Sequence, residues 1–205
     1  MTEESPPSTK MPSQARSMVT FANILSAATE IILERGVKGL NTNLVAERAA
    51  INVGTVYHYF PDKTAILTEL FRLQQKQRDD VLFEKLSELA TTPDVRGWTR
   101  ELFELLRQLR LDQPTAVPLR RAFNSIPRLA ELDRVETARY ARYLAELLER
   151  RFSSVDERRA DAVAHLLITI SVAVLDSPLM ESSGSTMFLD EAVRLVGIYF
   201  DDLGH

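Results

Sequence analysis

The sequence predicts an all-α protein in which a small amino-terminal helical domain precedes a larger helical bundle. Three observations lead to this prediction. Apolar residues after residue 17 recur at three- and four-residue steps, which is the spacing of one helix face. We find no convincing alternation of apolar and polar residues of the kind that predicts a strand. Prolines, glycines and serine-rich stretches divide the chain into segments of helical length.

About nine helices are expected, and the first four have recognisable ends. Gly36 supplies a stop for the first helix. Asn41 or Thr42 caps the second, Pro61 ends the third, and Asp62 caps the fourth by accepting bonds from its first free N–H groups. The expected helices cover residues 18–35, 42–49, 53–60, 63 into the 80s, 95–111, 115–125, 128–153, 156–176 and 187–203.

The later helices are separated by local breaks in the apolar pattern. These breaks are "TTPD", Pro114, Pro127, "FSSVDE" and "SPLMESSGS". The chain has 205 residues, which is enough for one large domain or for a small domain joined to a larger one.

Composition excludes some classes of site and indicates one kind of partner. The chain has no cysteine, so disulfides and cysteine-ligated metal sites are excluded. The net charge is −4, yet residues 10–63 carry six Lys/Arg against four Asp/Glu, whereas residues 64–205 carry nineteen against twenty-three. A small basic module on an acidic body can still bind phosphate locally.

The sequence also predicts a cytoplasmic location without membrane insertion. The first seventeen residues are polar, rich in proline and serine, and lack the apolar stretch of a signal peptide. The longest apolar run, "LLITISVAVL" at 166–175, is shorter than the roughly 20 residues that a membrane span needs.

The segment 53–60 is expected to be a short helix with two different sides. Val53, Val56 and Phe60 form a narrow apolar stripe that can pack against the preceding helices. Thr55, His58 and Tyr59 are expected on the opposite side, with Tyr57 at the border, while Gly54 allows a partner close to the backbone. Hydroxyls and an imidazole suit phosphate oxygens and base edges.

Two short helices joined by a turn of three to four residues make a helix-turn-helix, whose second helix enters the DNA major groove. Lys63 supports this interpretation. A cation in the first turn of a helix opposes the helix dipole at a cost of about 0.3–1 kcal/mol. A phosphate bound there by the ammonium and the free N–H groups would reverse that cost.

The stretch "TNLVAERAAINVGTVYHYFPDKTAIL" resembles the DNA-binding domain of the TetR family of bacterial transcriptional regulators. The matching features are "VA.RA", "GTVYHYF" and the lysine three residues later, and the resemblance covers about residues 18–70. It implies three parts: a disordered tail at 1–17, a helix-turn-helix domain at 18–63, and a ligand-binding and dimerisation domain at 64–205. One departure is Ala50, where the family commonly has glycine. If this position needs positive φ, alanine costs on the order of 1 kcal/mol.

The resemblance also implies the roles of individual residues. Thr42 and Asn43 would reach the DNA backbone and a base, Val53, Gly54, Thr55 and His58 would face the major groove, Tyr57, Tyr59 and Lys63 would hold phosphates, and Lys10 and Arg16 of the tail could touch the DNA. Each role has an alternative. The tyrosines could be half-buried amphipathic residues, His58 a solvated bystander, Thr42 only a cap, and the tail residues could lack any ordered contact.

The last two long helices are expected to form a homodimer. Residues 160–175 are apolar nearly all round, so that helix needs burial on more than one side. A four-helix bundle across a two-fold axis, which is also the family's arrangement, would achieve this. The candidate interface residues are Leu167, Ile170, Val174, Val193, Val196 and Phe200. The alternative is that 160–175 is simply a central core helix.

The family places an effector pocket between the 63–85 helix and the 160–175 helix. The candidates here are aromatic or polar residues in otherwise apolar helices, namely Trp98, Phe103, Phe123, Asn124, Tyr140, Tyr143 and His165. Aromatics at helical spacing are more often core residues, and a lone imidazole among apolar residues is more often a satisfied core or interface group. A real pocket should be mainly apolar with few polar anchors.

The sequence as a whole therefore predicts a homodimeric regulator that binds a palindromic DNA operator. We expect a repressor that an unknown small apolar or amphipathic effector releases, with no cofactor and no metal. An enzyme is disfavoured, because the three histidines have no metal spacing and no catalytic motif is present. A third possibility is a helical protein–protein adaptor that has lost DNA binding, which only Ala50 supports.

Overall fold

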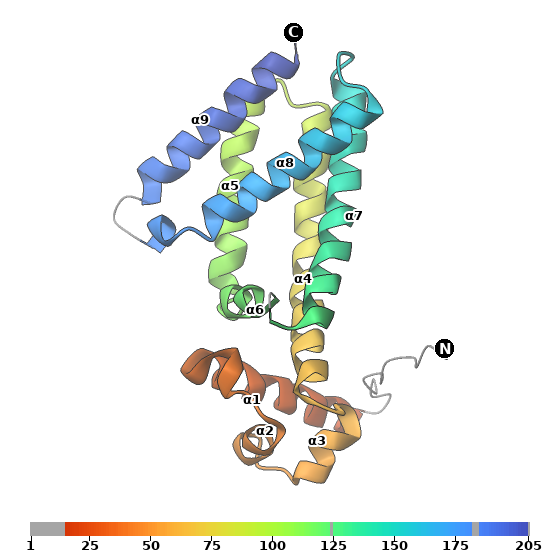
Figure 1. The fold of residues 1–205 in the computed structure, drawn as a ribbon, viewed down its shortest axis with the longest axis vertical. Helices are drawn as coiled ribbons and strands as arrows, with labels where there is room; N and C mark the ends of the chain where they lie inside the picture. The colour runs from red at the N-terminus through yellow and green to blue at the C-terminus, as the bar shows by residue number, and fades with distance from the viewer. Residues whose placement is uncertain (1–14, 124, 182–184, 205) are drawn as a thin grey trace. The chain divides into compact units, whose positions relative to one another are not determined.

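The fold is all-α, as the sequence predicts. The computed structural model describes residues 15–123, 125–181 and 185–204, and Lys10 and Asn124 lie outside these residues. The described part contains nine α-helices and two 3₁₀ helices (Figure 1). They are α1 (Ala15–Gly39), α2 (Thr42–Arg48), α3 (Val53–Tyr59), α4 (Lys63–Ser87), η1 (Glu88–Ala90), α5 (Val95–Asp112), α6 (Ala116–Phe123), α7 (Pro127–Arg151), α8 (Glu157–Leu175), η2 (Pro178–Glu181) and α9 (Ser185–Leu203).

The predicted helix ends agree closely with the observed ones. Helical geometry in α1 is interrupted at Gly36, where φ is 68° and ψ is 174°, so this glycine stops the helix as expected. Such a conformation is essentially restricted to glycine. The fourth helix begins at Lys63, and the Asp62 carboxylate accepts a 2.8 Å hydrogen bond from the Ala65 N–H. The cap predicted from the sequence is therefore confirmed.

The chain packs into two compact units. The amino-terminal unit comprises the residues up to Lys76 together with Gln113–Glu131, and the carboxy-terminal unit comprises Gln77–Asp112 together with the residues from Leu132 onward. This packing division differs from the sequence division after residue 63, since the start of α4 and the whole of α6 belong with the first three helices. Helix α6 lies against α1.

The amino-terminal unit is held together by an apolar core and an ion-pair network. The ring of Phe21 on α1 stacks on that of Phe60 with centroids 5.0 Å apart. The Arg48 guanidinium of α2 donates to Glu34 at 2.7 and 2.8 Å and to Glu30 at 3.1 Å. The hydrogen bonds from Arg48 lower the pKa of the Glu34 carboxyl. These contacts fix α2 against α1.

Helix α1 is the one described helix that is long and apolar enough to cross a membrane by length and composition. An 18-residue window within Arg16–Gly39 has a mean hydropathy of 1.2, and this helix is longer than the apolar run at 166–175 that the sequence singled out. Ile24 and Ile31 of this helix are fully buried in the amino-terminal unit. A core helix of a soluble protein passes the same test, so the finding is weak evidence for a membrane span.

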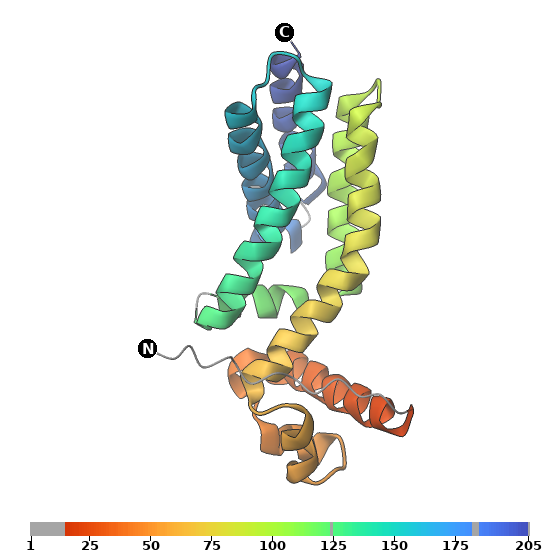
Figure 2. The same ribbon diagram turned by 90° about the vertical axis from the view of Figure 1, so that its right-hand side faces the viewer.

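The carboxy-terminal unit is a bundle with its own apolar core. Helix α5 lies against α9, and α8 contacts both. Figure 2 shows these helices together with α7 and the later turns of α4, which belong to the same unit. Trp98 of α5 is 3% exposed, and its ring N–H donates to the Lys85 carbonyl at 2.9 Å. Its ring also meets that of Phe200 edge-on with centroids 6.0 Å apart. The core thus joins α5 to α9 and to the end of α4.

Candidate nucleic-acid interface

Helix α3 is capped at its start and clamped along one side. The Asn52 side chain accepts a 2.7 Å hydrogen bond from the Gly54 N–H. Val56 and Phe60 are fully buried, and Val53 is half-buried. A helix of seven residues has little stability of its own, so these contacts hold it in place.

The opposite side of α3 is open to solvent. Gly54 and His58 are exposed, the Tyr57 side chain is 52% exposed, and Thr55 is half-buried. These residues offer hydroxyl and imidazole groups outward together with a short stretch of accessible backbone. Thr55 and His58 therefore lie on this side as predicted, and Tyr57, which was expected at the border, lies there as well.

The prediction that Tyr59 points outward is wrong. Tyr59 is only 7% exposed, and its ring meets Phe21 edge-on with centroids 5.9 Å apart. Its hydroxyl lies 2.7 Å from the Ser17 hydroxyl of α1. The reason is helical register, since Tyr59 follows Val56 by three residues and therefore shares its buried face. Tyr57 is the outward tyrosine.

Asn41 caps helix α2, so the hydroxyl of Thr42 is available for a different contact. The Asn41 side chain accepts a 2.8 Å hydrogen bond from the Leu44 N–H. Thr42 is 8% exposed, and its Oγ1 donates to the Tyr57 hydroxyl at 3.0 Å. Asn43 is exposed. Thr42 is thus neither the cap nor an open surface residue.

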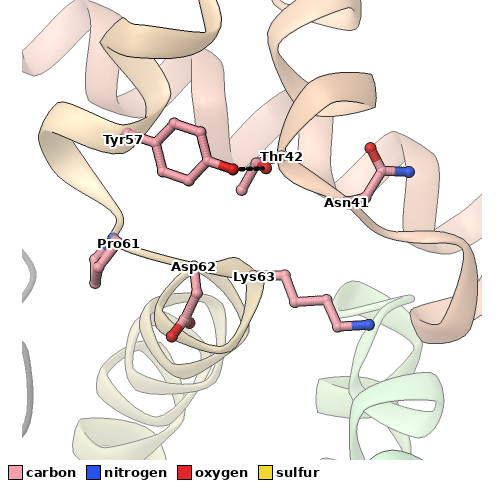
Figure 3. A pocket seen from close by; sticks show the side chains of 6 residues that line it. All are labelled: Asn41, Thr42, Tyr57, Pro61, Asp62 and Lys63. Carbon is pink, nitrogen blue, oxygen red and sulfur yellow. Dashed lines mark hydrogen bonds between the residues drawn. The ribbon is translucent and has the colours of Figure 1, made fainter.

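A hollow of about 160 Å³ lies where these segments meet the start of α4 (Figure 3). Lys63 is exposed in the first turn of α4, and Arg16 is exposed in the first turn of α1. A phenol hydroxyl and an ammonium border this hollow and can bind an anion. The Asp62 carboxylate already caps the N-terminus of α4 there. The residues that line the hollow are Asn41, Thr42, Tyr57, Pro61, Asp62 and Lys63.

The turn between α2 and α3 has the backbone conformation that usually requires glycine. Ala50 has a φ of 52°. The Ile51 N–H bonds to the Ala46 carbonyl at 3.0 Å, and the Ala50 N–H bonds to the Glu47 carbonyl at 3.1 Å. These two bonds define a Schellman motif, with Ala50 at its left-handed position. The turn therefore keeps its geometry despite the alanine, and Ala50 gives no support to a loss of DNA binding.

We expect Ala50→Gly to stabilise the amino-terminal unit by about 0.5–1 kcal/mol. Glycine removes the steric cost of left-handed backbone, and the greater freedom of the unfolded chain offsets part of this gain. Ala49→Gly is the matched control, because Ala49 has a φ of −78° and should lose stability instead. Urea unfolding measures both changes. Equal destabilisation by both glycines would contradict the strain at Ala50.

Most of the candidate effector residues are packed into the core. Trp98 and Phe103 are 3% and 1% exposed. Tyr140 is buried, donates its hydroxyl to Asp79, and has its pKa raised to about 12 by burial. Tyr143 is half-buried and meets the Phe83 ring edge-on with centroids 5.0 Å apart.

Three further candidates do not join this group. His165 lies on the exposed face of α8, so its placement in an interior pocket is wrong. Because α8 is apolar nearly all round, its sequence does not indicate whether His165 faces the core or the solvent. Phe123 ends α6 in the amino-terminal unit, and Asn124 lies outside the described residues.

Four of the six predicted dimer residues lie in the core of their own unit and are not on an outward face. Those on α9 are buried in the core of their own unit, as is Leu167 of α8, while Ile170 and Val174 are half-buried. The exposed fractions of Leu167, Val193, Val196 and Phe200 are 7%, 5%, 4% and 3%. The outward faces carry Leu166 on α8 and Leu195 and Ile198 on α9, which are 48%, 59% and 52% exposed.

Sequence reasoning missed two hydroxyl pairs beside the open face of α3. Thr42 pairs with Tyr57 across 15 residues, and Ser17 pairs with Tyr59 across 42 residues. The sequence gives no spacing signal for such pairs, because they depend on how three helices pack.

Comparison with known proteins agrees with this geometry. Residues 24–70 match the model of the bacterial regulatory proteins of the tetR family. The fatty acid metabolism regulator protein of Bacillus subtilis (strain 168) is 32% identical over 74 residues, which are 36% of this chain and 38% of that protein. The matched region thus spans less than half of this curated relative.

Solved structures resemble the chain over most of its length. The fatty acid degradation regulator FadR from Bacillus halodurans has a TM-score of 0.65 at 18% identity, covering 92% of this chain and 97% of that one. NalD, the secondary repressor of the MexAB-OprM multidrug efflux pump in Pseudomonas aeruginosa, has a TM-score of 0.65 at 18% identity, covering 88% and 97%. At such identity the likeness establishes the fold alone.

Proposed function

We propose that this chain, whose residues 24–70 match the model of the bacterial regulatory proteins of the tetR family, acts as a homodimeric repressor that a small effector releases from DNA. The observation that supports this most directly is helix α3. Val56 and Phe60 hold it from one side, while Thr55, Tyr57 and His58 are available on the other. This arrangement suits insertion into a major groove.

The contacts divide into two kinds. Tyr57 and Lys63 border the hollow at the start of α4 and would hold backbone phosphates, which fixes the position of the protein on the duplex. Thr55 and His58 would read base edges, and Gly54 would let the helix approach them closely. Val53 and Asn43 flank this surface, and Arg16 is available for a further phosphate.

A single α3 offers too few contacts for tight specific binding, so two copies should engage two half-sites of a palindrome. The outward faces of α8 and α9 are the best candidate for the dimer surface, because Leu166, Leu195 and Ile198 expose apolar side chains there. Two such pairs of helices would bury these residues in a four-helix bundle.

The effector is proposed to be a small apolar or amphipathic molecule bound by the helices that follow the DNA-binding motif. It would favour a conformation in which the two α3 helices no longer match the half-site spacing. Helix α4 can transmit the change, since its first turns belong to the amino-terminal unit and its later turns to the carboxy-terminal unit.

The test of this function is binding to the DNA upstream of the protein's own gene over a series of salt concentrations. Lys63→Ala should weaken binding to all sequences and lower the salt slope by about 1. His58→Ala should instead relax preference at one base position, by about 1–3 kcal/mol of discrimination.

Lys76→Ala is the matched control, because Lys76 is exposed on the same helix outside the proposed interface. It should leave both affinity and preference nearly unchanged. Absence of any specific complex at low salt would refute the proposal for that DNA. A dimer that ignores DNA altogether would favour the adaptor.

A further inference from the structure

We propose that Thr42 is a positioning residue for DNA binding and not itself a DNA contact. Its hydroxyl holds the Tyr57 hydroxyl so that the phenolic proton is directed to a backbone phosphate. The inference rests on the proposed function, and it assigns the two residues different roles where the family resemblance gives both of them to the DNA backbone.

The exposure of the two residues separates their roles. Thr42 is 8% exposed, whereas the Tyr57 side chain is 52% exposed. The Thr42 hydroxyl points to the end of the Tyr57 ring, across the gap between α2 and α3 (Figure 3). A duplex approaching this face would therefore meet the phenol first.

The hydroxyl of Thr42 is free for this task because Asn41 caps α2. A threonine at the start of a helix commonly serves as the cap, but here the Asn41 side chain already accepts the Leu44 N–H. Threonine is also β-branched and therefore stiff about χ1. Burial and a stiff χ1 together hold the Thr42 Oγ1 in place.

The direction of the hydrogen bond decides what Tyr57 can do. Thr42 Oγ1 donates to the Tyr57 oxygen at 3.0 Å, so the phenol accepts and keeps its own proton. A phosphate oxygen is an acceptor and needs a donor. If Tyr57 donated to Thr42 instead, it would have no proton left for phosphate. With Thr42 as the donor, the Tyr57 proton is left free for an acceptor in the hollow that Lys63 borders.

The second hydroxyl pair provides an internal comparison. Ser17 and Tyr59 lie 2.7 Å apart in the same unit, but Tyr59 is only 7% exposed. Loss of the Ser17 hydroxyl removes a similar serine or threonine to tyrosine bond without touching the outward phenol. Ser17→Ala therefore controls for the general effect of losing such a bond.

The experiment is a double-mutant cycle read out by DNA affinity. The probe is a duplex that the wild-type protein enriches from a random pool, and binding is followed by fluorescence anisotropy. Tyr57→Phe should weaken binding by roughly tenfold or more, as expected for a hydrogen bond to a charged group. Thr42→Val should weaken it by roughly threefold to tenfold, as expected for a neutral hydrogen bond.

The coupling between the two positions identifies the role of Thr42. In the Tyr57→Phe background, Thr42→Val should cause almost no further loss, because no phenolic proton remains to be directed. Thr42→Ser should restore most of the affinity, since it keeps the hydroxyl. Ser17→Ala should combine additively with Tyr57→Phe. Thr42→Ala repeats the cycle if the valine variant does not fold.

Two outcomes would overturn the inference while leaving DNA binding intact. An equal loss from Thr42→Val with and without the Tyr57 hydroxyl would mean that Thr42 contacts DNA itself. Unchanged affinity of Thr42→Val would mean that the hydrogen bond has no role in binding. If the wild-type protein enriches no duplex, the proposed function fails, and that result is distinct from both.

Discussion

Replacing Phe60 with alanine should destabilise the amino-terminal unit by about 3–5 kcal/mol, the range for large buried aromatic residues. Phe60 is fully buried and stacks on Phe21 with ring centroids 5.0 Å apart. A small domain has about 5–15 kcal/mol of stability in total, so this loss would release α3 from its support. Amide hydrogen exchange in α1 and α3 measures the effect residue by residue.

Phe60→Leu is the control for this substitution. It keeps most of the apolar volume and should cost no more than about 1–2 kcal/mol. DNA binding should fall sharply in the alanine variant and only slightly in the leucine variant. A loss below about 1 kcal/mol for Phe60→Ala would show that this ring does not clamp α3.

Replacing both Leu195 and Ile198 with aspartate should convert the proposed homodimer to a monomer of 23.2 kDa. The two side chains are 59% and 52% exposed on the outward face of α9, so the chain can fold around the change. Two carboxylates per subunit would be desolvated without partners in the proposed interface, which opposes association strongly. DNA affinity should fall by roughly 100-fold or more, because the two half-sites are no longer linked.

Leu111→Asp is the matched control for the dimer surface. Leu111 is 61% exposed on α5, so the same chemical change is made on another face of the unit. Analytical ultracentrifugation should find this variant dimeric, like the wild-type protein. A double aspartate variant that remains dimeric would place the interface elsewhere, and a monomeric wild-type protein would contradict the homodimer.

The sequence predicted the helices well because their signals are local. Gly36 and Asp62 end and begin helices through contacts within one turn, and the structure confirms both. The steric cost expected for alanine at position 50 was predictable for the same reason, because a φ of 52° depends on the local geometry of the turn. The match of residues 24–70 to the family model likewise rests on a continuous stretch of chain.

The side-chain arrangement of the candidate site could be predicted only in part. Register placed Val56 and Phe60 inside and His58 outside, because these positions follow the stripe along one short helix. Tyr59 was misplaced because the predicted apolar stripe contained only Val53, Val56 and Phe60. A residue three positions after Val56 also lies on that buried side of the helix. The buried hydroxyl of Thr42 was missed because its partner lies on another helix.

The sequence by itself determined that the chain is all-α, where most of its helices begin and end, and which family its DNA-binding segment resembles. Each of these depends on residues close together in the chain. Tertiary structure alone decided which tyrosine faces outward, which hydroxyls pair, and which sides of α8 and α9 remain exposed. A helix that is apolar nearly all round has no preferred side until another helix covers one, so the exposed side depends on residues distant in sequence.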